Sequence, residues 1–148
     1  MRHKFQMLPM AFVLLLASCA VSSRQLPPGE LGRQFSSTIP GTWTGASHEG
    51  GSTCAMVKTY RRDGSAEGVL YFKHQATPGV SVVMPEVPFI SRWRVKGDVI
   101  ECYDIQTEYP GMFKQGLIIR DRLISVSPNK IVSRSEKTNE KETLTRVR

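Results

Sequence analysis

Residues 53–74 read TCAMVKTYRRDGSAEGVLYFKH, and the pattern of this stretch indicates the class of fold. Asp63-Gly64 lies near its centre, and this dipeptide is a strong short-range signal for a tight turn between antiparallel strands. The flanking runs, residues 53–61 and 66–74, contain many β-branched and aromatic residues, which favour strands. The sequence therefore predicts a β-hairpin here.

Similar runs recur on both sides of this hairpin, and turn residues separate them. Lys96-Gly97-Asp98 predicts a second tight turn. Between the two turns, residues 75–88 contain several prolines and are predicted to form a long connection. The remaining predicted strands are residues 42–47, 89–95, 99–107, 116–127, 130–135 and 142–148.

Eight strands that are mostly joined by tight turns close most easily into a barrel, because closure leaves no exposed sheet edge. We therefore expect residues 39–148 to form one all-β domain, an eight-stranded antiparallel up-and-down barrel. Its size of about 110 residues is common for a domain with a single core.

The two ends of this domain carry a matching pair of residues. Gly41-Thr42-Trp43 opens the first predicted strand, and Arg146 lies near the end of the last. This pattern resembles the lipocalins and lipocalin-like barrels, in which a Gly-x-Trp packs under an arginine of the final strand. The resemblance implies that Arg146 covers Trp43 at the closure of the barrel, a cation–π contact of about 0.5–2 kcal/mol.

Residues 1–18 have the pattern of a secretion signal. Arg2 and Lys4 precede an apolar run over residues 7–16, which is too short to span a bilayer. Leu16-Ala17-Ser18-Cys19 resembles the lipobox of bacterial lipoproteins, which implies cleavage before Cys19 and lipid attachment to its thiol. Several acyl chains on one residue give stable anchoring. The alternative is an ordinary signal peptide.

Residues 19–38 have few apolar residues and a Pro-Pro-Gly break, so we expect a lipidated, partly flexible tether. The alternative for this segment is one helical turn, in which Leu31 and Phe35 pack against the domain. Ala20 follows the cysteine, which by resemblance to enteric lipoproteins implies an outer-membrane anchor, with the domain expected to face the periplasm.

The chain is basic, with 20 Lys and Arg, 13 Asp and Glu and a formal net charge of +7. Removal of residues 1–18 takes away two basic residues and leaves +5. Outside the cytoplasm, this modest excess suits anionic head groups or an acidic protein better than nucleic acid, so no nucleic-acid partner is expected.

Cys54 and Cys102 remain after processing. An even pair of cysteines in an oxidising compartment predicts a disulfide, which would stabilise the fold by about 2–4 kcal/mol. Two separate buried thiols are the alternative.

The sequence offers little for catalysis. His48 and His74 are the only histidines after the signal, and His48 lies in a glycine-rich stretch that predicts a hairpin loop. The carboxylates are scattered singly, at Asp63, Asp98, Asp104 and Asp121, and most of them lie at or beside turns. We therefore expect a protein that is not an enzyme and has no metal or cofactor.

The expected function is the binding of a small apolar or amphiphilic ligand in or at the barrel. The residues expected to line its interior are Val57, Leu70, Phe72, Ile100 and Ile119. A candidate ligand or partner surface comprises Phe72 and Ile100 together with Val82 and Met84 of the long connection, which is a candidate lid.

The alternative is an interaction protein of the envelope. The opening Gly-x-Trp, the early cysteine, Trp93-Arg94-Val95-Lys96-Gly97-Asp98 and the closing arginine strand are similar to barrel-type inhibitors of bacterial metalloproteases. This resemblance implies that residues 36–40 and 75–88 contact a secreted hydrolase.

Overall fold

The structure is a computed structural model that describes residues 26–49 and 51–148, without the side chain of Glu49. The predicted signal peptide and Cys19 lie outside these residues. One helix, α1 (Glu30–Thr38), precedes the strands. The strands are β1 (Gly41–Glu49), β2 (Ser52–Tyr60), β3 (Ser65–Thr77), β4 (Val80–Val83), β5 (Val87–Lys96), β6 (Val99–Thr107), β7 (Ile119–Val126), β8 (Lys130–Ser135) and β9 (Lys141–Arg146).

Eight of these strands form a closed antiparallel barrel. β1, β2, β3, β5, β6, β7, β8 and β9 pair in this order, and β9 pairs back with β1, where Trp43 lies opposite Arg146. The all-β, up-and-down barrel predicted from the sequence is confirmed. Local turn chemistry sets the β2–β3 hairpin, because the Asp63 carboxylate accepts hydrogen bonds from Ser65 N–H and Oγ–H.

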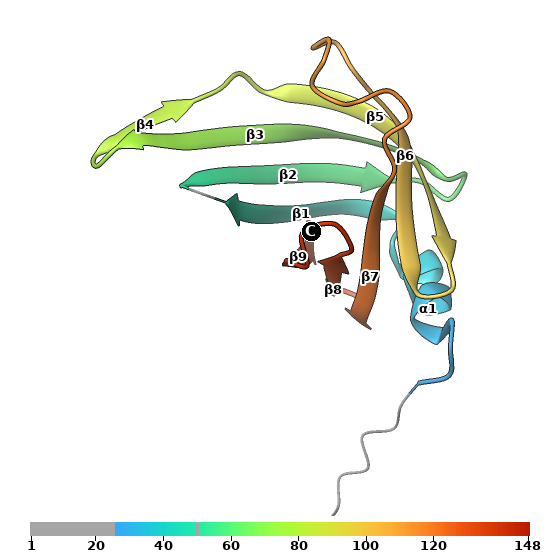
Figure 1. Cartoon of the computed structure of the whole chain (residues 1–148). Coiled ribbons are helices and arrows are strands. Elements are labelled where there is room, and N and C mark those ends of the chain that lie inside the picture. The colour runs from blue at the N-terminus through green and yellow to red at the C-terminus, as the bar shows by residue number, and fades with distance from the viewer. Residues whose placement is uncertain (1–25, 50) are drawn as a thin grey trace, which may run out of the picture.

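The long connection contains a ninth strand that the sequence analysis missed. β4 pairs with the end of β3, where Lys73 lies opposite Val83, so the β3–β4 hairpin extends beyond the barrel wall. Figure 1 shows this hairpin projecting at one end of the molecule and α1 at the other. Pro85 lies between β4 and β5 and Pro88 lies within β5, and these prolines obscured the strand pattern in the sequence.

α1 closes one end of the barrel, within the segment predicted to be tether. Phe35 of α1 and Ile39 after it are completely buried. Asp98, in the β5–β6 turn, caps the helix by accepting hydrogen bonds from the N–H groups of Gly29 and Gly32, each at 3.0 Å. A side chain at Gly32 would collide with the backbone of Gly97, so glycine permits this close approach. The tether prediction is therefore wrong for residues 30–38, and the helical alternative is confirmed.

Aromatic rings fill the space above α1. Phe35, Tyr60 and Trp93 make three edge-to-face contacts, with ring centroids 5.8 to 6.3 Å apart. Trp93 Nε1 donates to the backbone oxygens of Arg61 and Ser65 in the β2–β3 turn. The aromatic cluster thus joins the helix to the barrel wall.

Trp43 and Arg146 seal the same end, as the sequence analysis expected. The Arg146 guanidinium carbon lies 4.3 Å from the centroid of the Trp43 ring, and Trp43 Nε1 donates to the carbonyl of Ile39 at 2.7 Å. Arg146 also donates to the carbonyls of Thr38, Pro40 and Pro128. The last strand is therefore tied both to the helix end and to the β7–β8 turn.

The predicted disulfide between Cys54 and Cys102 is wrong, because both cysteines are free thiols. Cys54 belongs to β2 and Cys102 to β6, and at least two strands separate β2 from β6 in either direction around the barrel. The two thiols therefore lie on different walls. The alternative of two separate thiols is the one that the structure has.

Candidate functional site

The barrel interior contains a cavity of about 240 Å³ above the closed end. Its volume lies just below the range of about 300–1,000 Å³ typical of small-molecule sites. The apolar part of its wall comprises Met56, Leu70, Ile100, Ile119 and Leu144. The polar part includes Lys58, Tyr60, Asp121, Ser133 and Glu142 as well as both thiols.

Lys58 is the most deeply buried charged group in this cavity. Its side chain extends from β2 across the barrel, and Nζ donates to the sulfur of Cys102 on β6 at 3.2 Å. The same ammonium lies 4.6 Å from the ring centroid of Tyr60 and 5.6 Å from that of Phe89. Although only 4 % of the residue is exposed, cation–π contacts and a polarisable sulfur partly replace water around the charge.

Two carboxylates, Asp121 on β7 and Glu142 on β9, line the same cavity. Asp121 Oδ1 is fully buried and has no hydrogen-bond partner among the described residues. The salt bridges between described residues include neither carboxylate. A buried carboxylate oxygen without a donor is costly, and among the described residues the only other buried side-chain atom without a partner is the Ser91 hydroxyl oxygen.

The environment of the cavity shifts the pKa values of its acids. Burial, reinforced by the charge on Glu142, raises the pKa of Asp121 from its ordinary value of 3.8 to about 6. Burial, then the charge on Glu140, raises the pKa of Glu142. The charge on Lys58 lowers the pKa of both acids, but by less than the other causes raise it. Burial likewise raises the pKa of the Cys54 thiol, which therefore stays protonated at neutral pH.

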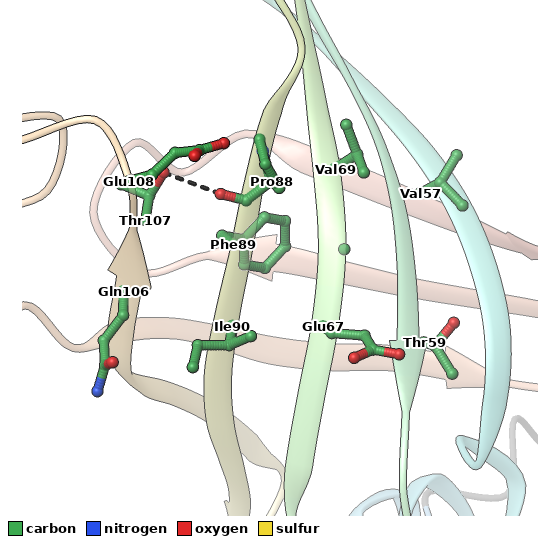
Figure 2. Close-up of a pocket in the computed structure, with 11 residues that line it drawn as sticks. Val57, Thr59, Glu67, Val69, Pro88, Phe89, Ile90, Gln106, Thr107 and Glu108 are labelled. Carbon is green, nitrogen blue, oxygen red and sulfur yellow. Dashed lines mark hydrogen bonds between the residues drawn. The ribbon is translucent and has the colours of Figure 1, made fainter.

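A second hollow lies on the outside of the barrel. It is an open groove of about 760 Å³ across β2, β3, β5 and β6. Figure 2 shows the side chains that line it. Its apolar residues are Val57, Val69, Pro88, Phe89 and Ile90, and Glu67 and Glu108 add acidic groups. Thr107 Oγ1 donates to the carbonyl of Pro88 at 2.8 Å and ties β6 to β5 at the rim.

The structure distributes the predicted interior residues between these two hollows. Leu70, Ile100 and Ile119 line the inner cavity as expected. Val57 does not, because it lies on the outer face and lines the groove. Phe72 is half-buried opposite Cys54 and is not part of the cavity lining.

The predicted ligand or partner surface is likewise divided. Ile100 lies inside the barrel, whereas Val82 and Met84 belong to the projecting β3–β4 region and are about half exposed. Val80 and Val83 beside them are also exposed. The structure therefore separates an interior ligand site from an exposed apolar strand.

Part of the segment 36–40, which is predicted to contact a hydrolase, also contributes to the fold. Ile39 is completely buried, and the carbonyls of Thr38 and Pro40 accept hydrogen bonds from Arg146. This segment therefore forms part of the barrel closure.

One further buried carboxylate, Glu101, lies on the outer face and is fully compensated. Arg94, Lys96 and Arg120 all contact it, at 2.6, 3.2 and 3.0 Å. Hydrogen bonding from Arg94, with help from Lys96 and Arg120, lowers the pKa of Glu101 to about 2 despite its burial. The cluster joins β5, β6 and β7 on the outside.

Sequence reasoning missed the charged residues of the cavity. Lys58 lies two residues from Met56 and from Tyr60, and therefore shares their inward face of β2. Asp121 likewise shares the inward face of β7 with Ile119 and Leu123. The sequence did contain a signal for them: each is a charged residue at a position where the alternation along the strand predicts an apolar one.

The described residues include no group of three or more His, Cys, Asp or Glu side chains arranged to hold a metal ion. Within the same residues, no helix has the length and apolarity needed to cross a membrane. The sequence matches no protein-family model and no curated protein.

Proposed function

We propose that this protein is an extracytoplasmic lipoprotein that binds a small amphiphilic molecule inside its barrel and is not an enzyme. The observation that carries the proposal is the inner cavity, which combines an apolar wall with buried polar groups. Such a combination suits a ligand with an apolar body and one polar group, because each part finds a matching surface.

The closed end of the barrel supports a site that is entered from the opposite end. α1, Phe35 and the Trp43–Arg146 contact fill the closed end. The charged residues of the cavity lie above this plug, on strands that run toward the other end. A ligand entering there would meet Ile119 and Leu70 along with Glu142.

The membrane anchor is supported by the sequence of the N-terminus. The lipobox-like residues 16–19 place the lipid on Cys19, and Ala20 favours delivery to the outer membrane. Ten residues separate Cys19 from α1, which allows a reach of at most about 35 Å. Because α1 lies at the closed end, this arrangement would direct the cavity entrance away from the membrane.

The non-enzymatic part of the proposal rests on the surroundings of the histidines. His48 Nδ1 contacts Thr53 Oγ1 at 3.0 Å, and His74 Nδ1 contacts Ser52 Oγ at 2.7 Å. Both pairs are exposed, and no described side chain orients either ring from its other nitrogen. Nucleophilic catalysis by a Ser–His pair requires such a third group.

Two mass measurements test this proposal on the full chain expressed in bacteria. The intact mass of the membrane-bound product should correspond to cleavage before Cys19 plus acyl chains, and Cys19→Ala should abolish both changes. Native mass spectrometry of the anchored protein should reveal a bound mass of a few hundred daltons that is released on denaturation. An unprocessed wild-type chain would contradict the anchor, and a mass without ligand at every tested concentration of envelope lipid extract would contradict the carrier function.

The exposed apolar surface favours protein binding as a second candidate function. Val80, Val82 and Val83 are at least half exposed on a strand that has a partner on only one side. The neighbouring groove is apolar with acidic groups, so a partner segment carrying apolar and basic side chains would suit it. A photo-crosslinker at Val83 should then give one discrete protein adduct, whereas a crosslinker at the exposed Arg62 should not. Equal labelling at both positions would reject this candidate.

A further inference from the structure

The cavity of the proposed carrier contains more acidic than basic groups. Lys58 is the only basic side chain in its lining, whereas Asp121 and Glu142 are both acidic. When both acids are ionised, the lining has a net charge of −1. A buried excess of charge is unfavourable unless a bound group compensates it.

Lys58 does not compensate the acids by direct contact. Its ammonium is directed at Cys102 and the rings of Tyr60 and Phe89, and no carboxylate of the described residues lies within 4.0 Å of it. Asp121 lies on β7 beside Ile100 of β6, and its Oδ1 atom is buried without a donor. The carboxylate therefore presents a buried oxygen atom that is an unused acceptor.

The structure offers a direct contrast on the other face of the same two strands. Glu101 lies beside Arg120 in the β6–β7 ladder and is contacted by three cationic side chains. Both positions exclude solvent from a carboxylate oxygen, but only the outer one supplies donors. The missing element at Asp121 is therefore a positively charged hydrogen-bond donor.

We propose that the cavity binds a small amphiphile with a protonated amine, whose N–H groups donate to Asp121 and whose apolar part packs against Ile100 and Ile119. This inference rests on the proposed carrier function and specifies the class of ligand. Glu142 supplies the second negative charge, so an amine is favoured over an alcohol of the same length. A carboxylate ligand is disfavoured, because its charge would be buried beside two acids. The volume of about 240 Å³ limits the ligand to a short chain or a small ring.

Hexylamine, hexanol and hexanoate test this assignment, since they share one apolar chain and differ in the head group. The full chain in phosphatidylcholine nanodiscs is titrated with each compound at pH 7.5 by isothermal calorimetry, with nanodiscs that lack protein as the blank. Hexylamine should bind at least about tenfold more tightly than the other two, as expected for hydrogen bonds to a charged group.

Asp121→Asn should weaken hexylamine binding at least about tenfold and leave hexanol binding within about twofold. Glu142→Gln should weaken the amine by a smaller factor and provides a second variant. Asp63→Asn is the matched control, because Asp63 is an exposed carboxylate in the β2–β3 turn. This substitution should leave the affinities for hexylamine and hexanol unchanged. Circular dichroism verifies that each variant is folded.

Each outcome distinguishes this inference from the carrier function itself. Tighter binding of hexanol or hexanoate, or amine binding that is unchanged in both variants, would overturn the amine assignment and leave the carrier function standing. Absence of binding for all three compounds would overturn both.

Discussion

The closed end of the barrel and the cavity above it follow opposite physical rules. At the closed end, the polar groups of Trp43, Arg146 and Asp98 have partners, and the apolar groups are tightly packed. In the cavity, Asp121 Oδ1 is buried without a donor, and the Lys58 ammonium contacts a thiol and two aromatic rings.

The closed end gives its polar groups partners that contribute to stability, whereas the cavity leaves one carboxylate oxygen without a donor. Unsatisfied buried groups reduce stability. Two buried side-chain atoms of the described residues lack a partner, Ser91 Oγ and Asp121 Oδ1, and the second lies in the cavity proposed as the ligand site. Five tests follow from this comparison, beginning with the largest expected effect.

Trp43→Ala should be the most damaging change. It removes a completely buried side chain, its hydrogen bond to Ile39 and the surface under Arg146. We expect the free energy of unfolding in urea to fall by about 3–5 kcal/mol. Leu70→Ala, in the wall of the cavity, is the matched comparison and should cost less, because that wall is already incompletely packed. Equal losses in the free energy of unfolding for the two variants would show that the closed end and the cavity wall are packed alike.

Asp121→Asn should instead stabilise the protein at neutral pH. Because the pKa of Asp121 rises from 3.8 to about 6 on folding, the folded state binds the proton more tightly than the unfolded state. This contribution to stability is complete below pH 3.8 and is lost as the pH rises to about 6. The loss amounts to about 3 kcal/mol. Urea unfolding of wild type and variant between pH 3.5 and 7.5 should show the two curves diverging across this window.

Glu101→Gln provides the control of opposite sign. The pKa of Glu101 falls from 4.5 to about 2 on folding, so its contribution is present above pH 4.5 and is lost as the pH falls toward 2. The variant should therefore be less stable than wild type at neutral pH, and the difference should shrink in acid. If both variants showed the same dependence on pH, the contrast between the two carboxylates would be wrong.

Asp98→Ala should have a smaller effect at the closed end. The substitution removes the acceptor for the N–H groups of Gly29 and Gly32, so the first turn of α1 loses its cap. We expect a loss of about 1 kcal/mol in urea unfolding and faster amide hydrogen exchange in residues 30–33. Asp98→Asn, which keeps one acceptor oxygen, should recover part of the stability. Unchanged exchange would show that α1 is held by Phe35 alone.

Reducing agent should have no measurable effect on the stability of the barrel. Cys54 and Cys102 are free thiols on different walls, so no bond is available for reduction. Thiol titration of the unfolded, unreduced protein should detect both groups, and urea midpoints with and without dithiothreitol should coincide. A shift of the midpoint would restore the disulfide predicted from the sequence.

Local sequence patterns were sufficient to predict the all-β barrel and the sites of most of its turns. Alternation of inward and outward residues and dipeptides such as Asp63-Gly64 act over a few residues, so these signals do not depend on the rest of the chain. The contact of Trp43 with Arg146 was also predictable, because barrel closure brings the first and last strands together.

The tertiary structure alone decided how the interior is used. Closure placed Val57 outside, kept Cys54 and Cys102 apart, packed α1 into one end and buried Asp121 without a donor. Each of these outcomes depends on which distant strands face one another across the barrel. Local pattern assigns a residue to one of two faces at most, whereas its neighbours across the interior are set by strand order and register.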